Sequence, residues 1–217
     1  MNVDVTYIIV VLGVVLVSMT LHEAMHAYAG YWLGDDTARL SGRLSLNPIK
    51  HIDPFLTVLL PLLLAISGAP IFGAAKPVPY NPNNIRWDEW GAALLAIAGP
   101  LTNLVLAFFI YGLSVYLGQP VNISGVTSGI VGLILTVGVM VNLGFFIFNL
   151  IPIPPLDGSR VLYALAPDFV RRGMESMERF GIIVVFALIL IGGSAFSTFL
   201  LGAMGFFVQL FAKIFGV

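Results

Sequence analysis

The chain of 217 residues contains no cysteine, which excludes disulfide bonds, cysteine-ligated zinc and cysteine nucleophiles. Charged residues are also scarce, at 10% of the sequence, whereas an average soluble domain has about 25%. The net charge of −1 indicates neither nucleic acid nor an acidic partner. Hydrophobic residues make up 59% of the chain. This composition predicts a multi-pass membrane protein embedded in the lipid bilayer.

Histidine is nearly absent too, and two of the three histidines stand close together in the sequence. His22 and His26 end an apolar run that begins at Val5, and on a helix their imidazoles face one side and can bind one metal ion. Glu23 is placed to act on a metal-bound water. Ionisable groups inside an apolar span are costly and are usually functional. The sequence therefore predicts a metal site on the first membrane helix.

A catalytic zinc site takes three protein ligands and keeps one position open for water. We choose Asp157 as the third ligand, because it follows a proline-rich helix break at a matching depth in the membrane. His51 and Asp53 are rivals, since they lie close together at the same membrane face. With Glu23 as the general base, one Zn²⁺ per chain would activate water for hydrolysis. The predicted ligands are His22, His26 and Asp157.

The apolar runs predict an all-α fold with a core of three membrane-spanning helices. The first runs from Val5 to about Leu33, and we expect it to be a retained span, not a cleaved signal peptide. The other two run from about Trp90 to Leu117 and from about Thr127 to Leu150. The segment Phe55–Phe72 is short and is broken by Pro61, so we expect it to re-enter the membrane without crossing it.

Two further regions complete the expected architecture. After Pro167 a short amphipathic helix should lie on the membrane surface, and Phe180–Ala212 should form a helical hairpin divided at residues 192–194. Apolar and polar residues alternate from Ala38 to Leu46, which predicts a short β-strand or hairpin near the cytoplasmic face. It would be either a plain surface hairpin or an edge that pairs with an extended peptide. We treat residues 1–217 as one membrane-embedded domain, with its core at about 5–165 and its C-terminal part at about 166–217.

The distribution of lysine and arginine predicts the orientation, because cytoplasmic loops carry an excess of both. Basic residues gather between Gly34 and Trp90 and again after Asp157, while Gly118–Val126 has none. They are Arg39, Arg43, Lys50, Lys76, Arg86, Arg160, Arg171, Arg172 and Arg179. The metal site would then face the cytoplasmic side of the cell membrane.

Three motifs in this order resemble the site-2 protease family of intramembrane zinc metalloproteases. They are His22-Glu23-Ala24-Met25-His26, Gly99-Pro100-Leu101-Thr102-Asn103, and Asn149 through Asp157-Gly158. The resemblance implies a three-helix core that holds zinc through the two histidines and Asp157. It also implies that Asn149 lies near the zinc and helps to hold the substrate carbonyl or the oxyanion.

Asn103 is similar to the family's asparagine on the second helix, and its role stays open between function and ordinary interhelical hydrogen bonding. The sequence shows no inserted PDZ-like domain, so it looks like a compact member of the family.

The expected reaction is hydrolysis of peptide bonds within or next to transmembrane segments of a membrane-protein substrate, with no nucleic acid involved. The alternative is a zinc-binding membrane protein without proteolysis, either a metal transporter or an inactive homologue that binds substrates. Gly91–Leu156 carries no charge, which argues against a transport path, and the presence of Glu23 argues against an inactive homologue. A hydrolase acting on lipid or isoprenoid ends is a third possibility.

Overall fold

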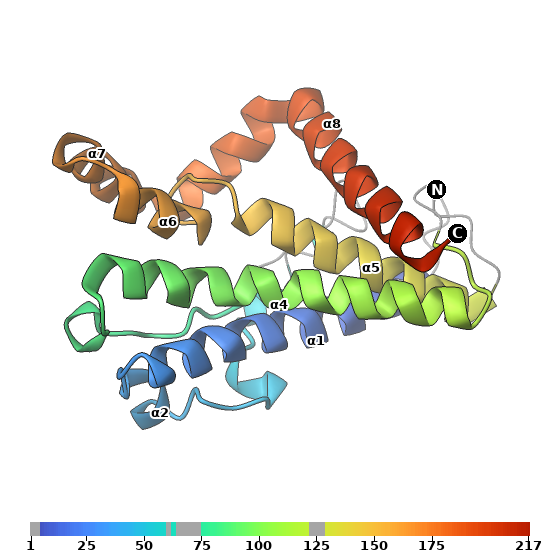
Figure 1. The fold of residues 1–217 in the computed structure, drawn as a ribbon, viewed down its shortest axis with the longest axis horizontal. Coiled ribbons are helices and arrows are strands. Elements are labelled where there is room, and N and C mark those ends of the chain that lie inside the picture. Colours follow the sequence, from blue (N-terminus) through green and yellow to red (C-terminus); the bar gives the residue numbers. More distant parts are fainter. Residues whose placement is uncertain (1–4, 60–61, 64–74, 122–128) are drawn as a thin grey trace.

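A computed structural model describes residues 5–59, 62–63, 75–121 and 129–217, and these residues are predominantly helical (Figure 1). The long helices are α1 (Val5–Trp32), α4 (Asp88–Tyr116), α5 (Gly129–Asn149) and α8 (Gly181–Phe215). The shorter ones are α2 (Thr37–Leu40), α6 (Gly158–Leu165) and α7 (Asp168–Glu178). Single turns are η1 (Pro48–Lys50), η2 (Pro54–Leu59) and η3 (Pro82–Asn84). Within the described residues, four helices are long and apolar enough to cross a membrane, namely α1, α4, α5 and most of α8.

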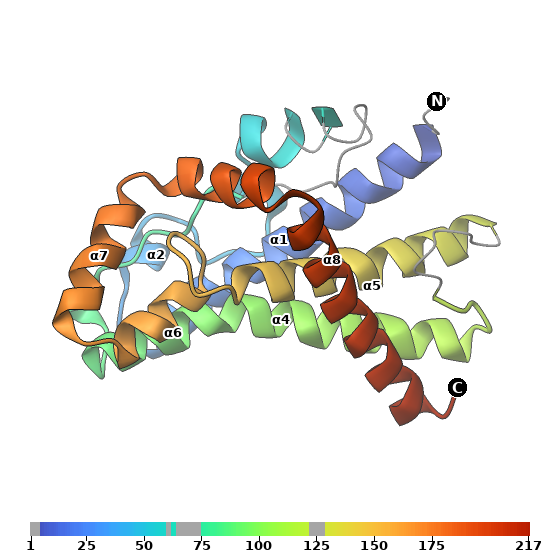
Figure 2. The ribbon, with the colours of Figure 1, turned by 90° about the horizontal axis from the view of Figure 1, so that it is seen from above.

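The helices α1, α4 and α5 lie side by side and form the core of the molecule (Figures 1 and 2). Val11 and Val15 of α1 pack against Val137 of α5, while Ala107 of α4 and Leu143 of α5 belong to a second buried cluster. The outward faces of these helices remain apolar, which suits contact with lipid. The three predicted spans are confirmed, with ends within two residues of those expected from the sequence where the structure describes them.

The last helix, α8, is bent at Gly193, whose backbone has the non-helical angles φ +46° and ψ −126°. Figure 1 shows the two halves of α8 meeting at this bend. The second half packs Met204 and Phe211 onto the core formed by α4 and α5, and Phe215 lies against Gly112. The division of this region that the sequence predicts at residues 192–194 is therefore confirmed.

The predicted β-strand or hairpin at Ala38–Leu46 is wrong. Residues 37–40 form the helix α2, followed by a turn in which Gly42 has φ +67° and the amide of Arg43 donates to the carbonyl of Ala38 at 2.8 Å. The alternation of apolar and polar residues does not correspond to a buried and an exposed face, because the apolar Leu40 is 80% exposed while the charged Arg43 is buried. Arg43 is drawn inward because its guanidinium binds backbone carbonyls, including that of Lys50.

The predicted re-entrant segment Phe55–Phe72 lies mostly outside the described residues. Its first part falls in η2, a short π-helical segment that begins at Pro54. Asp53 caps this segment by accepting a hydrogen bond from the amide of Phe55 at 3.0 Å. Re-entry into the membrane stays a prediction.

A non-helical segment, Lys76–Asn81, precedes η3 and α4. We call this segment the strap. It is held through its backbone at both ends. Arg43 donates to the carbonyl of Lys76 at 2.5 Å, and the amide of Asn81 donates to the carboxylate of Asp35 at 2.8 Å. Asp35 lies three residues after the end of α1, so the strap is fixed near the end of that helix.

Asp35 is buried and accepts several hydrogen bonds. The donors are the amide and hydroxyl of Thr37, the amide of Asn81 and the side chain of Asn84. Burial alone would raise the pKa of Asp35 above its ordinary value of 3.8, but these hydrogen bonds lower it below that value. The carboxylate is therefore ionised at neutral pH and holds the strap and η3 against the end of α1.

Candidate metal centre

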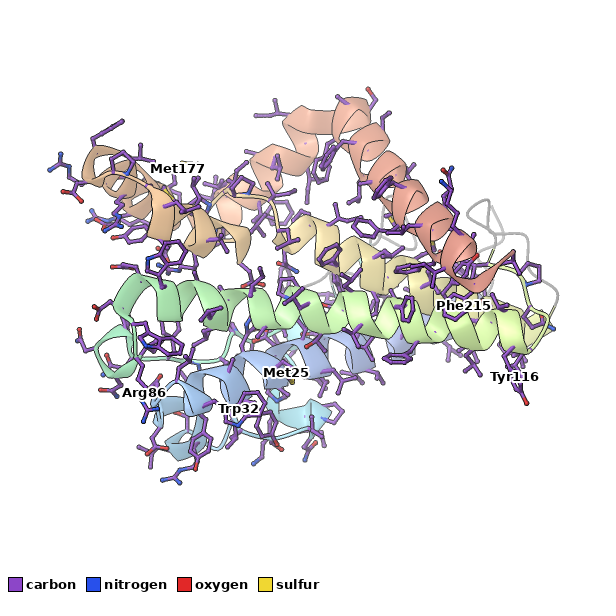
Figure 3. All side chains as sticks on the ribbon, in the orientation of Figure 1. Met25, Trp32, Arg86, Tyr116, Met177 and Phe215 are labelled. Carbon is purple, nitrogen blue, oxygen red and sulfur yellow. The ribbon has the colours of Figure 1, made fainter. Side chains whose placement is uncertain are left out.

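The first part of the centre is the face of α1 that carries His22, Glu23 and His26. All three side chains are buried, although they belong to a helix that is apolar enough to span a membrane. The Nε2 atoms of the two histidines lie 3.0 Å apart, as expected for residues one helical turn apart. Figure 3 labels Met25, which directly precedes His26 in the sequence and so marks the level of the site along α1.

Asp157 completes the group from the far end of the chain. Its Oδ2 atom lies 3.2 Å from Nε2 of His22 and 3.4 Å from Nε2 of His26. Helix α5 ends at Asn149, and the following proline-rich turn returns the chain so that Asp157 precedes α6. Gly158 makes this return possible, because a Cβ atom there would lie 2.2 Å from the carbonyl oxygen of Leu150.

The hydrogen bonds of the two imidazoles decide which ring nitrogens face the centre of the group. Nδ1 of His26 lies 2.9 Å from the carbonyl oxygen of Leu95, and Nδ1 of His22 lies 2.5 Å from Oδ1 of Asn103. Both oxygens can only accept, so both Nδ1 atoms carry hydrogen, and a neutral ring then has its lone pair on Nε2. The lone pairs of both Nε2 atoms consequently converge on one point.

Oδ2 of Asp157 reaches the same point and is buried without a hydrogen-bond donor among the described residues. Three electron-pair donors that face one another are stabilised by a cation between them, either a metal ion or a proton on one ring. A proton on each ring would be unfavourable, because two positively charged imidazolium Nε2–H groups would then face each other across 3.0 Å.

The spacing of these three atoms suits zinc. Zn²⁺ binds imidazole nitrogen and carboxylate oxygen at about 2.0–2.2 Å, which separates neighbouring tetrahedral ligands by about 3.3 Å. The separations in this group are 3.0, 3.2 and 3.4 Å. Two imidazoles and one carboxylate are also a donor set that catalytic zinc accepts, with one position left open. The residues present therefore fit a zinc ion.

The helix α4 closes the site from the other side. Leu95, Gly99 and Asn103 are spaced four residues apart and thus share the face of α4 that meets the histidines. A Cβ atom at Gly99 would lie 2.4 Å from Nε2 of His26 and 2.6 Å from Nε2 of His22. Only glycine lets α4 approach the two ligand atoms this closely.

Glu23 stands beside the two histidines, and its Oε2 atom accepts a hydrogen bond of 3.1 Å from the amide of Val78 in the strap. The ligand atoms of Glu23 and the two histidines lie within 4.8 Å of one another. The amide binds one of the two carboxylate oxygens, and the carboxylate lies beside the histidine nitrogens that would hold the metal.

The other candidates from the sequence make local hydrogen bonds. Nε2 of His51 donates to the carbonyl of Ser45 at 2.7 Å, and Asp53 caps η2, so these rivals to Asp157 serve local structure. Nδ2 of Asn149 donates to the carbonyl of Phe145 at 3.0 Å within its own helix.

Sequence reasoning missed four contributors to the site, and each acts through a feature that motifs do not display. These are the space left by Gly99, the amide of Val78, and the hydrogen-bonding side chains of Asn142 and Ser18. The Gly-Pro pair in α4 was a visible signal for the first of them. Nothing in the sequence distinguishes the other three.

Comparison with known proteins gives the family of this chain. The model of peptidase family M50 matches residues 117–192. The chain is 41% identical over 174 residues to YwhC from Bacillus subtilis (strain 168), whose name describes a candidate zinc metalloprotease, and the match covers 80% of this chain and 76% of YwhC. The chain belongs to peptidase family M50, the site-2 protease family.

Two Rip2 proteins, also named as candidate zinc metalloproteases, are similar to this M50 chain. The one from Mycolicibacterium smegmatis (strain ATCC 700084 / mc(2)155) is 32% identical over 85% of this chain and 67% of its own length. The one from Mycobacterium tuberculosis (strain ATCC 25618 / H37Rv) is 30% identical over 81% of this chain and 64% of its own length. No solved structure matches the chain. Family membership and the four apolar helices together make it a multi-pass membrane zinc metalloprotease.

Proposed function

We propose that this M50 protease cleaves peptide bonds within or next to transmembrane segments of membrane proteins, with Glu23 as its general base. The observation that carries the proposal is the convergence of His22, His26 and Asp157 beside Glu23, inside helices that suit a bilayer. A water-soluble substrate would not reach such a site easily, whereas a segment that is already in the membrane would.

Zinc would be held by Nε2 of His22, Nε2 of His26 and a carboxylate oxygen of Asp157, one ion per chain. When bound, it supplies a Lewis acid that activates water and polarises the scissile carbonyl. The carboxylate of Glu23 accepts a proton from the attacking water and then delivers it to the nitrogen of the leaving amine. The peptide bond and one water molecule are thereby converted into a carboxylic acid and an amine.

Substrate helices must unwind locally before this reaction, because their carbonyls are engaged in their own hydrogen bonds. Asn149 stands at the break that precedes Asp157, and its Nδ2 carries a second hydrogen beside the one given to Phe145. We assign that hydrogen to the substrate carbonyl or the oxyanion. The basic loops around the Trp32 end of α1 support our assignment of the active site to the cytoplasmic side of the cell membrane.

The decisive experiment compares wild type with Glu23→Gln, in detergent or liposomes, for zinc content and for cleavage of a panel of single-span membrane proteins. Glutamine keeps an oxygen that can accept from Val78 but is no base. We expect equal zinc contents and a loss of cleavage rate of about 10²–10⁴-fold, the usual contribution of general acid–base catalysis.

Glu89→Gln is the matched control, because it makes the same chemical change in the first turn of α4, away from the metal centre. It should cleave like wild type. Zinc bound to wild type without cleavage of any substrate would support a zinc-binding protein without proteolysis, and cleavage by Glu23→Gln at the wild-type rate would refute the assigned base.

A further inference from the structure

Two asparagines are completely buried between the core helices, at a place where an apolar side chain would cost less. Asn103 of α4 and Asn142 of α5 are 0% and 1% exposed. They lie in contact with each other and connect the metal ligand His22 to Ser18, one turn earlier on α1. Buried polar groups in a membrane protein are expensive unless all of their hydrogen bonds are made.

The partners of Asn142 fix the orientation of its amide. Its Nδ2 atom donates to the carbonyl of Gly138 at 2.8 Å and lies 3.0 Å from Oγ of Ser18, so both of its hydrogens point away from α4. Its Oδ1 atom therefore faces α4 and can only accept. It accepts from Nδ2 of Asn103 at 2.8 Å.

This contact, together with a longer one of 3.5 Å from Nδ2 of Asn103 to the carbonyl of Ser18, fixes the orientation of Asn103. Because its Nδ2 atom donates to Asn142, its Oδ1 atom is turned toward Nδ1 of His22. An amide turned over by 180° would present N–H to Nδ1, and His22 would then carry its hydrogen on Nε2, where the metal needs a lone pair. His26 has no such problem, because its partner is the backbone carbonyl of Leu95, which cannot turn over.

We propose that Asn142 is a positioning residue for the metal centre, which acts by holding the amide of Asn103 in the one orientation that leaves Nε2 of His22 free for zinc. This inference rests on the metal site of the proposed function. The hydrogen bonds of Asn142 go to Asn103, Ser18 and Gly138, and of these three residues Asn103 is the one that contacts a metal ligand, His22.

The test is a double-mutant comparison of zinc affinity, measured on the full-length protein in detergent by competition with a chromophoric chelator. Asn142→Leu removes the acceptor and should weaken zinc binding about 10- to 100-fold, as the loss of a ligand's hydrogen-bond partner usually does. In Asn103→Asp the side chain at position 103 no longer has to be oriented, because either carboxylate oxygen can accept the hydrogen bond from Nδ1 of His22. In the Asn103→Asp protein, adding Asn142→Leu should cause no further loss of affinity.

Thr136→Val is the control, a nearly isosteric loss of another buried polar group on α5, and it should bind zinc like wild type. Wild-type affinity in Asn142→Leu would overturn the proposal. So would an equal loss caused by Asn142→Leu in both backgrounds, or failure of the double variant to fold, since either result assigns Asn142 a general structural role. Absence of zinc binding by wild type would instead refute the metal site itself.

Discussion

Gly99→Ala adds one carbon atom at the most crowded point of the metal centre. The new Cβ would lie 2.4 Å from Nε2 of His26 and 2.6 Å from Nε2 of His22, whereas ordinary contacts begin at 3.4 Å. Either the ligands or α4 must therefore move by up to about 1 Å, but a zinc site tolerates only about 0.2 Å in its ligand distances. The substitution thus acts directly on the two atoms that would bind the ion.

Overpacking of this kind costs about 1–3 kcal/mol, which corresponds to about 5- to 150-fold in affinity. Since both histidines are displaced, we expect the upper end, about 100-fold weaker zinc binding. Helix propensity acts in the opposite direction, because alanine is better than glycine inside a helix by about 1 kcal/mol. The metal-free protein should therefore unfold near the wild-type temperature while its zinc affinity falls.

The assay is chelator competition for zinc, together with thermal unfolding of the metal-free protein in detergent. Gly13→Ala is the matched control: it makes the same change within α1, where a Cβ atom would meet nothing within 4 Å. It should leave zinc affinity unchanged. Equal zinc affinity of the Gly99→Ala and Gly13→Ala proteins would refute the close approach of α4 to the ligands.

Two more predictions concern carboxylates. Asp157→Asn should lower zinc affinity more than about 100-fold, because it removes a charged ligand and not merely a hydrogen-bond partner of a ligand. The loss is measured as zinc content after dialysis. Asp168→Asn, at the exposed start of α7, is the control. Asp35→Asn should destabilise the protein by about 1–2 kcal/mol at neutral pH, the difference between charged and neutral hydrogen bonds. The pKa of Asp35 is lower in the folded state, so its stabilisation is present above the ordinary value of 3.8 and is lost as pH falls through the folded pKa. The unfolding temperatures of wild type and Asp35→Asn should therefore converge below pH 3.8, and a constant difference down to the lowest pH measured would contradict this account.

The long spans could be predicted because a charge-free run of some twenty residues has few stable structures other than a membrane helix. The proline-rich break likewise directed attention to Asp157 before any contact was known. The alternating pattern at Ala38–Leu46 misled because nine residues are too few to separate a strand from a helical turn whose arginine is pulled inward. The hydrogen bonds from Arg43 to backbone carbonyls determine the conformation of that segment.

The role of Asn142 could not be predicted from the sequence, for a different reason. A neutral amide in an apolar helix has the same sequence signature whether it faces lipid, another helix or a metal ligand. Its partners Ser18 and Asn103 are 124 and 39 residues away, and only folding brings them together. The same holds for the amide of Val78, which reaches Glu23 across 55 residues.

The way the strap is held bears on how this protease can vary in sequence. Its hydrogen bonds to other segments use main-chain atoms, namely the amide and carbonyl of Lys76, the carbonyl of Pro77 and the amides of Val78 and Asn81. The side chains that hold it belong to other segments. Apart from Tyr80, whose ring lies under Arg160, and Asn81, which caps η3, strap side chains can be exchanged while these hydrogen bonds remain, provided that the new residue at 76 or 78 is not proline. Such a segment lets a lineage change the side chains around Glu23 while the backbone that binds Glu23 stays in place.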